Sequence, residues 1–306
     1  MSYPFTTRKL KPMIMRTLSL VILTTIVLSG CQFSKSVKKD FVTGLTTIGN
    51  VLSCDDIYLT VKDQKITRNT FVYGEKLYVN FNDIKGFIKE NEYVFPGMEL
   101  TITDLKGDTV FKADDLYADF PNGVNYTPLL LSADIIVADP MHSGSDYTLF
   151  ISIWDKKGSG TFEAKLPFKI KPNEAIKVEA NSVSYNEIYL FSENGNEVIT
   201  DNIIHYDDNV YVLFEGLTGF KVTDGLVFPG LSLKVSDADN NSILDYENLF
   251  TEYSEKGIDP ESLAQRVSCH FSLTGSGAKN PLHCIVSVHD MKSEAKVIAS
   301  TELTIQ

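Results

Sequence analysis

An internal duplication is the feature that most constrains how this chain of 306 residues can fold. Short segments recur 133 residues further on, and flanking segments recur at offsets of 131 and 135. The recurring pairs are Tyr78–Phe81 with Tyr211–Phe214, Gly86-Phe87 with Gly219-Phe220, Val94–Gly97 with Val227–Gly230, Ile57–Leu59 with Ile188–Leu190, and Ile151–Asp155 with Val286–Asp290. Since a period of this length is too long for a solenoid, it predicts a tandem pair of domains. Copy one spans residues 51–171, copy two spans residues 175–306, and a short linker around Pro172 joins them.

Alternating polar and apolar residues predict that both copies are all-β. In copy one, Leu77, Val79 and Phe81 fall on one face of a strand, and comparable runs recur between clusters of Gly, Asn and Asp. This pattern is typical of a β-sandwich. In strand count and length each copy resembles bacterial immunoglobulin-like domains, which implies two tandem immunoglobulin-like β-sandwich domains. Short helical turns are expected at residues 113–120, 246–253 and 260–266.

Residues 1–30 have the pattern of a secretory signal peptide. An apolar run at residues 17–29 follows a basic stretch ending at Arg16, and it is short for a transmembrane helix. The segment Leu28-Ser29-Gly30-Cys31 resembles the lipobox of bacterial lipoproteins. That resemblance implies cleavage before Cys31 and acylation of this cysteine, palmitate included, as a membrane anchor. An ordinary signal peptide with an unrelated cysteine is the alternative. Three start sites stay open, at Met1, Met13 and Met15.

The sequence after Cys31 bears on where the protein resides. Gln32, rather than Asp, follows the cysteine, and by resemblance to proteobacterial sorting rules this implies the outer membrane of the cell envelope. Whether the protein faces the periplasm or the cell surface stays open. Residues 31–50 show no alternation and are expected to form a flexible tether between the anchor and copy one.

The charge of the chain excludes nucleic acid as a partner. Its formal net charge is −12, and four of its 28 basic residues precede residue 31, which leaves 24 against 40 acidic residues. Binding to phosphates needs a surplus of Lys and Arg. The partners that remain are the membrane, through Cys31, and an envelope protein or a glycan.

Two cysteines of copy two are candidates for a disulfide. Cys269 and Cys284 flank a loop and are expected to lie opposite each other on one face of a hairpin, where an oxidising compartment would favour a cross-strand bond. Two buried thiols are the alternative. Copy one has Ala133 and Leu149 at the corresponding positions, so the fold does not depend on the bond. Cys54 is expected to be a buried thiol.

Two features of copy two are candidate metal sites. The same hairpin register would place His270 opposite His283, which could hold a metal weakly or form a surface pair. The segment 237–245 is similar to a calcium loop, but Ser242 stands where such a loop needs Gly and Asn248 where it needs Glu. A polar hairpin tip explains this segment equally well, so no metal site and no cofactor are predicted.

Trp154, the only tryptophan, and Phe150 are the candidate ligand-binding residues. Both are expected on the outward face of a strand, where they could stack on a sugar ring or meet a partner. Burial under a loop or the other domain is the alternative. The chain shows no nucleophile with its base, no phosphate loop and no cluster of His and carboxylates, so no catalytic residue is nominated.

These features predict a non-enzymatic, membrane-anchored lipoprotein whose two β-sandwich modules bind protein or glycan or take part in envelope assembly. One alternative is a carbohydrate-capture lipoprotein that uses Trp154 and Phe150. Another is a pilus subunit, because the architecture is similar to that of Bacteroidetes fimbrillins. In that family an Arg near the first strand is cleaved, and Arg68 is the only Arg between Cys31 and Arg266. An enzyme is the third alternative.

Overall fold

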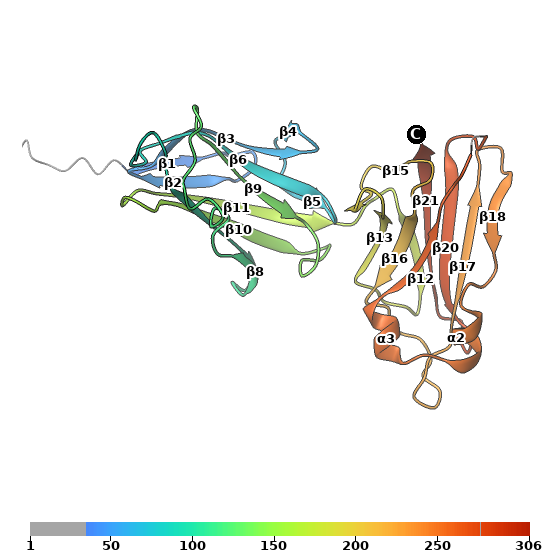
Figure 1. Ribbon diagram of the computed structural model, residues 1–306. Coiled ribbons are helices and arrows are strands. Elements are labelled where there is room, and N and C mark those ends of the chain that lie inside the picture. Colours follow the sequence, from blue (N-terminus) through green and yellow to red (C-terminus); the bar gives the residue numbers. More distant parts are fainter. Residues whose placement is uncertain (1–34, 276) are drawn as a thin grey trace, which may run out of the picture.

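The computed structural model describes residues 35–275 and 277–306 and shows two β-sandwich domains in tandem (Figure 1). The strands of the second domain run across the direction of those in the first, and β11 leads into the connection between them. The predicted signal peptide at residues 1–30 and the predicted acylation site at Cys31 lie outside the described residues. Among the described residues no helix combines the length and hydropathy needed to cross a membrane.

The first domain packs a large sheet against a smaller one. The large sheet has the order β1-β2-β11-β10-β7-β8 with β5 parallel to β11, and the smaller has the order β4-β3-β6-β9. The strands are β1 (Lys35–Lys39), β2 (Thr46–Asn50), β3 (Ser53–Val61), β4 (Gln64–Ile66), β5 (Thr70–Val72), β6 (Lys76–Lys85), β7 (Pro96–Asp104), β8 (Thr109–Ala113), β9 (Leu130–Ile136), β10 (Asp146–Asp155) and β11 (Thr161–Lys171).

The second domain repeats this arrangement. Its larger sheet has the order β12-β21-β20-β17-β18 with β15 parallel to β21, and its smaller sheet has the order β14-β13-β16-β19. The strands are β12 (Lys177–Asn181), β13 (Glu187–Ser192), β14 (Glu197–Val198), β15 (Ile203–Ile204), β16 (Val210–Glu215), β17 (Pro229–Ser236), β18 (Ser242–Tyr246), β19 (Val267–Phe271), β20 (Leu282–Asp290) and β21 (Lys296–Ile305).

The strand order is that of an immunoglobulin-like sandwich. One sheet holds β3, β6 and β9 in the places of strands A, B and E, and the other holds β7, β10 and β11 in the places of C, F and G. The short β5 crosses to the second sheet and pairs in parallel with β11. The same relations hold in copy two, which confirms the predicted fold class of two tandem immunoglobulin-like domains.

The register of the strands confirms the duplication. Val79 pairs with Ala133 in copy one, and the equivalent Val212 pairs with Cys269 in copy two. Leu149 pairs with Ile102 as Cys284 pairs with Val235. The correspondence of Ala133 and Leu149 with the two cysteines is therefore correct.

The predicted helical turns are confirmed only in copy two. Helix α2 (Thr251–Lys256) and helix α3 (Pro260–Gln265) lie at one end of the second sandwich (Figure 1). Asp259 begins α3 by accepting a hydrogen bond from the backbone N–H of Ser262, and Pro260 occupies the first turn, where its missing N–H costs nothing. The counterpart at residues 113–120 forms turns without a helix.

The prediction of a flexible tether at residues 31–50 is wrong from Lys35 onward. Strands β1 and β2 extend the large sheet of the first domain, with β2 pairing with β11 and β1 pairing with β2. Strand β2 corresponds to β12 of copy two, because Gly49 pairs with Phe162 as Ala180 pairs with Val297. In the described part of copy two, no strand corresponds to β1.

Each domain has its own hydrophobic core between its two sheets. Phe71, Phe81 and Phe214 are among the largest fully buried side chains, and the first two belong to the core of copy one. Tyr189 and Leu213 are exceptions, because they belong to copy two but pack with the core of copy one. Both side chains point outward from the small sheet of copy two, and the first domain covers them.

Candidate functional site

The repeated motifs form structural contacts rather than a site. Gly86 and Gly219 both have positive φ, and a Cβ there would lie within 2.5 Å of a backbone oxygen, of Val51 and Ser182 respectively. Only glycine tolerates such a close approach in this conformation. The duplicated Gly-Phe pairs are thus explained by packing.

Trp154 is half-buried and lies over the neighbouring strand. Its indole ring fills the space that a Cβ at Gly97 would need. In copy two, His289 covers Gly230 in the same way. Trp154 therefore occupies the outward face and contacts the neighbouring strand at Gly97, and a ligand-binding role for it stays a prediction.

Phe150 lies on the same outward face and is 38% exposed. It lines a shallow pocket of about 220 Å³ with Ile48 and Lys165, and the Lys165 ammonium is 5.4 Å from the centre of its ring. At strand rise, four residues separate Phe150 from Trp154 by roughly 13 Å. Trp154 does not line this pocket, so the pair does not form one continuous platform.

The hairpin expected between Cys269 and Cys284 is wrong. Strand β19 pairs with β16, whereas β20 pairs with β17 and β21, so the two cysteines stand in opposite sheets. Alternation along a strand fixes which face is buried but not which sheet the strand joins. Both thiols are free in the same core, and burial raises the pKa of each to about 12. A bond between them would cross the sandwich and stays a prediction. Cys54 is also a buried free thiol, as expected.

The same correction separates His270 from His283. His270 stacks on Tyr211 of β16 with ring centres 5.0 Å apart, and His283 lies 3.7 Å from the carboxylate of Glu302. The two imidazoles face outward from opposite sheets and share no site.

The segment resembling a calcium loop is a hydrogen-bonded turn. One carboxylate oxygen of Asp237 accepts from the backbone N–H groups of Asp239 and Asn241, both at 2.9 Å. Asp104 makes the same two contacts in copy one, with Lys106 and Asp108. Within the described residues no group of three His, Cys, Asp or Glu side chains is placed to hold a metal ion.

A cleft of about 640 Å³ lies between the two domains, and the sequence alone does not reveal it. Both copies contribute walls, copy one through β6 and the turns around Lys62 and Ala138, copy two through the turn at Gly195 and through Arg266. Its ring-bearing residues are Tyr73, Tyr78, Tyr189 and Phe191. Clefts at domain boundaries with aromatic walls are preferred places for ligands.

The floor of the cleft is a pair of tyrosines from different copies. The rings of Tyr73 and Tyr189 are 5.2 Å apart, and both are largely buried. Tyr189 donates its hydroxyl to Glu215 at 2.8 Å, while the backbone N–H of Asp139 donates to the Tyr73 hydroxyl at 3.3 Å. Burial raises the pKa of Tyr73 to about 12 and also holds that of Tyr189 above its usual range, so both remain neutral donors.

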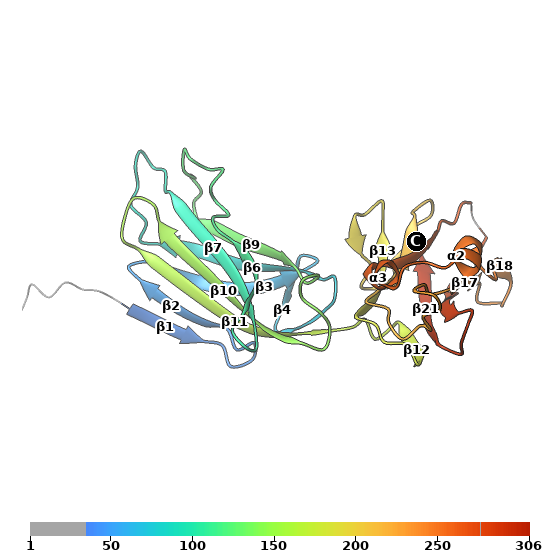
Figure 2. The same ribbon diagram turned by 90° about the horizontal axis from the view of Figure 1, so that it is seen from below.

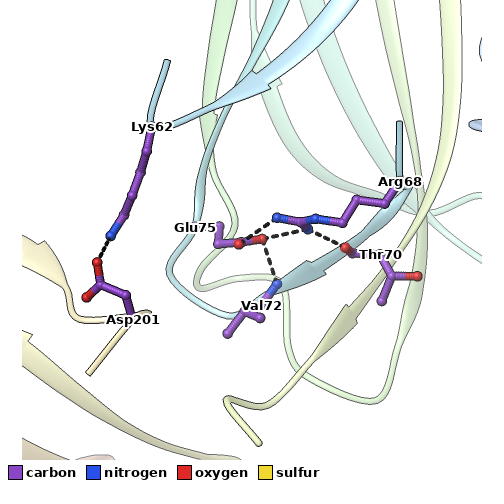
Figure 3. Close-up of polar contacts among 6 residues, drawn as sticks. All are labelled: Lys62, Arg68, Thr70, Val72, Glu75 and Asp201. Carbon is purple, nitrogen blue, oxygen red and sulfur yellow. Dashed lines mark hydrogen bonds and ion pairs between the residues drawn. The ribbon is translucent and has the colours of Figure 1, made fainter. Parts of the chain in front are cut away.

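Each basic side chain that lines the cleft is already in an ion pair with a carboxylate. Lys62 of copy one pairs with Asp201 of copy two (Figure 3). Lys76 lies 3.1 Å from Asp134. Arg266 lies 3.0 Å from Glu215. A phosphate or carboxylate ligand would therefore have to displace a carboxylate already in place.

Arg68 and Glu75 stiffen the wall contributed by copy one. Figure 3 shows the guanidinium of Arg68 bound by two nitrogens to the Glu75 carboxylate, at 2.7 and 2.9 Å. Glu75 also accepts from the backbone N–H of Val72 at 2.9 Å, and Arg68 donates to the carbonyl of Thr70. This bidentate pair fixes the turn that presents Tyr73.

The duplication itself hides the cleft from sequence reasoning. Tyr73 corresponds to Tyr206, and Tyr58 corresponds to Tyr189, so each copy carries both tyrosines. Only Tyr73 of copy one and Tyr189 of copy two meet. Nothing in either copy alone marks the pair.

These observations define a class, a tandem pair of immunoglobulin-like β-sandwich domains, whose fold is consistent with a binding or structural module. No protein-family model matches the sequence, and no curated protein matches it. The chain is similar to solved fibronectin(III)-like modules of Clostridium thermocellum CbhA, at 10% identity over 81% of this chain and 94% of that one with a TM-score of 0.20. It is similar to a structure named pT26-6p, at 9% identity over 96% and 69% with a TM-score of 0.25. It is also similar to a DUF3823 family protein from Bacteroides ovatus, at 14% identity over 72% and 94% with a TM-score of 0.20. At these scores the likenesses carry no argument about a site, and function must be argued from the residues.

Proposed function

We propose that this protein is a non-enzymatic lipoprotein of the cell envelope that binds a neutral saccharide in the cleft between its two β-sandwich domains. The observation that supports this proposal most directly is the aromatic cleft shared by the two copies. The lipid anchor is supported by the sequence from Leu28 to Cys31, and an outer-membrane location by Gln32.

The chemistry of the cleft favours an uncharged ligand with both apolar faces and hydroxyl groups. Tyr78 and Phe191 are half-buried and offer ring surface to the C–H face of a sugar. Asn196 and Glu197, on the copy-two wall with Phe191, supply acceptors and donors for hydroxyls. Because the basic groups are already paired, an anionic ligand is less suited to this site.

A glycan array probed with the mature chain tests this proposal. We expect binding to neutral oligosaccharides, and we expect Tyr78→Ala and Phe191→Ala each to weaken it roughly 2- to 12-fold, because one stacked ring contributes about 0.5–1.5 kcal/mol. Trp154→Ala is the matched control, since it removes an aromatic ring from another face. Loss of binding in Trp154→Ala with none in the cleft variants would move the site to Trp154 and Phe150. If the chain binds no glycan but crosslinks specifically to an envelope protein, then the saccharide proposal is wrong and the ligand is a protein.

Anchoring is tested separately. A C-terminally tagged chain grown with labelled palmitate should incorporate the label and fractionate with the outer membrane. The variant Cys31→Ser should lose the label. If the parent chain stays unlabelled, the lipoprotein part of the proposal fails while saccharide binding is unaffected.

A further inference from the structure

We propose that strand β1 and the turn that follows it form a contact surface for anionic phospholipid, which lays the edge of the first domain on the membrane. The surface, called the basic strip here, consists of Lys35, Val37, Lys38, Lys39, Phe41 and Val42. Figure 2 shows β1 at the outer edge of the sheet, beyond β2.

The apolar members of the strip are unusually exposed for a folded domain. Phe41 is 89% exposed, Val42 71% and Val37 67%. All five residues of β1 are exposed, so this strand adds no side chain to the core. A run of exposed apolar side chains beside lysines is the composition of segments that insert shallowly at the lipid interface.

The lysines of the strip are available to lipid headgroups. In the part of the chain that the structure describes, no carboxylate lies within ion-pair distance of Lys35, Lys38 or Lys39. Lys38 donates to the carbonyl of Cys54 at 3.3 Å, and the Lys39 ammonium is 5.8 Å from the centre of the Phe41 ring.

The acids near the strip are already engaged. Asp40 accepts from the backbone N–H of Val42 and the hydroxyl of Thr43, both at 2.8 Å, and these hydrogen bonds lower the pKa of its carboxyl. Asp55 pairs with Lys85 at 2.7 Å. Asp40 stays ionised, but the three lysines outnumber it, so the strip is a local basic surface on a chain whose net charge is −12.

The duplication shows that the fold does not need this strand. The edge that β1 covers in copy one is the outer edge of β2, and the equivalent strand β12 is the uncovered edge of its sheet in copy two. An added strand of exposed lysines and apolar residues in only one copy thus calls for a role outside the sandwich.

The strip lies close in the sequence to Cys31, the proposed point of attachment to the membrane. Three residues separate Cys31 from Lys35, so the two Cα atoms are at most about 14 Å apart. This distance argument rests on the proposed acylation of Cys31. The exposure and charge of the strip do not depend on it.

The experiment uses the mature chain with Cys31→Ser, so that no acyl chain contributes, and measures co-sedimentation with vesicles. The vesicles are phosphatidylcholine with or without phosphatidylglycerol. We expect binding to the anionic vesicles only, weakened by salt, and roughly 100-fold weaker after Lys35→Gln, Lys38→Gln and Lys39→Gln are combined. Combining Phe41→Ser with Val42→Ser should also weaken binding.

The matched control combines Lys106→Gln, Lys177→Gln and Lys221→Gln, which removes the same charge from exposed lysines elsewhere. It should retain binding. Equal loss in both triple variants would show a general charge effect and overturn the proposal, as would no binding by the parent or equal binding to neutral vesicles. Because no acyl chain is present, failure of Cys31 acylation cannot produce these results.

Discussion

At the scale of single residues, Gly86 is one of the glycines that the backbone cannot replace without strain. Its φ is +100°, and a Cβ would lie 2.4 Å from the carbonyl oxygen of Val51. We expect Gly86→Ala to lower the free energy of unfolding by roughly 2–4 kcal/mol, because both the backbone conformation and the neighbouring strand must adjust. Denaturant unfolding of the folded chain measures this loss.

Gly107 is the matched control for that substitution. Its φ is +90°, but a Cβ there would meet nothing within 4 Å. Gly107→Ala should therefore cost only the backbone strain, roughly 1 kcal/mol. Equal losses in the two variants would show that close approach at Gly86 is unimportant.

Glu187 gives the junction between the domains a dependence on pH. It is 2% exposed, burial raises the pKa of its carboxyl, and it accepts from the backbone N–H of Ser143 in copy one. Because the Glu187 carboxyl has a higher pKa in the folded state than in the unfolded state, its contribution to the free energy of unfolding is fully present below the unfolded pKa. It is lost as pH rises through the folded value.

We therefore expect Glu187→Gln to be more stable than the parent at pH values above the folded pKa and to lose this advantage in acid. The amide oxygen can still accept from Ser143, so the contact remains. Thermal unfolding of both chains from acid to alkaline pH measures the difference. Parallel curves for the two chains would contradict the prediction.

At the scale of elements, alternation predicts a strand only when its apolar side faces the core. Strand β6 follows that rule and could be predicted. Strand β2 reverses it, because Thr47 and Gly49 face inward while Ile48 is 40% exposed, and for this reason the sequence predicts a tether there. The segment between β19 and β20 could not be predicted for another reason. Its length suits a hairpin, but the chain crosses between sheets there.

Strand β1 should be dispensable for folding. A chain that begins at Asp40 loses no buried side chain, and the lost backbone hydrogen bonds are offset by the entropy of five residues that need no longer be ordered. We expect the free energy of unfolding to fall by less than about 2 kcal/mol. Denaturant unfolding of the truncated chain tests this.

A longer truncation is the control. Removing residues up to Asn50 also removes β2 and the buried Leu45, and should destabilise the chain by several kcal/mol. If removing β1 alone is as damaging, then β1 serves the fold, and the absence of a counterpart in copy two needs another explanation.

At the scale of the whole molecule, the candidate cleft forms where Tyr73 of copy one meets Tyr189 of copy two, although each tyrosine has an equivalent in the other copy. The sequence shows that both copies carry the tyrosines, but which ones meet depends on the arrangement of the domains. Short-range patterns describe each copy and contain no information on that arrangement. For this reason the sequence predicts Trp154 and Phe150 as ligand-binding residues instead. Their position on an outward strand face, and their replacement by other residue types in copy two, can be read from the sequence alone.

The arrangement of the two domains should depend on Tyr189 more than on the ion pair between Lys62 and Asp201. Tyr189 buries its ring against Tyr73, whereas the side chains of the ion pair are 52% and 42% exposed, and such pairs contribute about 0–1 kcal/mol. We expect Tyr189→Ser to free the domains from each other, seen in small-angle X-ray scattering as a larger radius of gyration and a broader distance distribution, while Lys62→Ala leaves the curve unchanged.

Tyr58→Ser provides the internal control for this measurement, because Tyr58 is the copy-one equivalent of Tyr189 but does not line the cleft. It should leave the scattering curve as it is in the parent. An unchanged curve for Tyr189→Ser would mean that Leu213, Glu187 and the linker hold the domains without the tyrosine pair. A change in both tyrosine variants would point to damage within the small sheets. Only a change confined to Tyr189→Ser connects the meeting of two duplicated tyrosines to the shape of the ligand cleft.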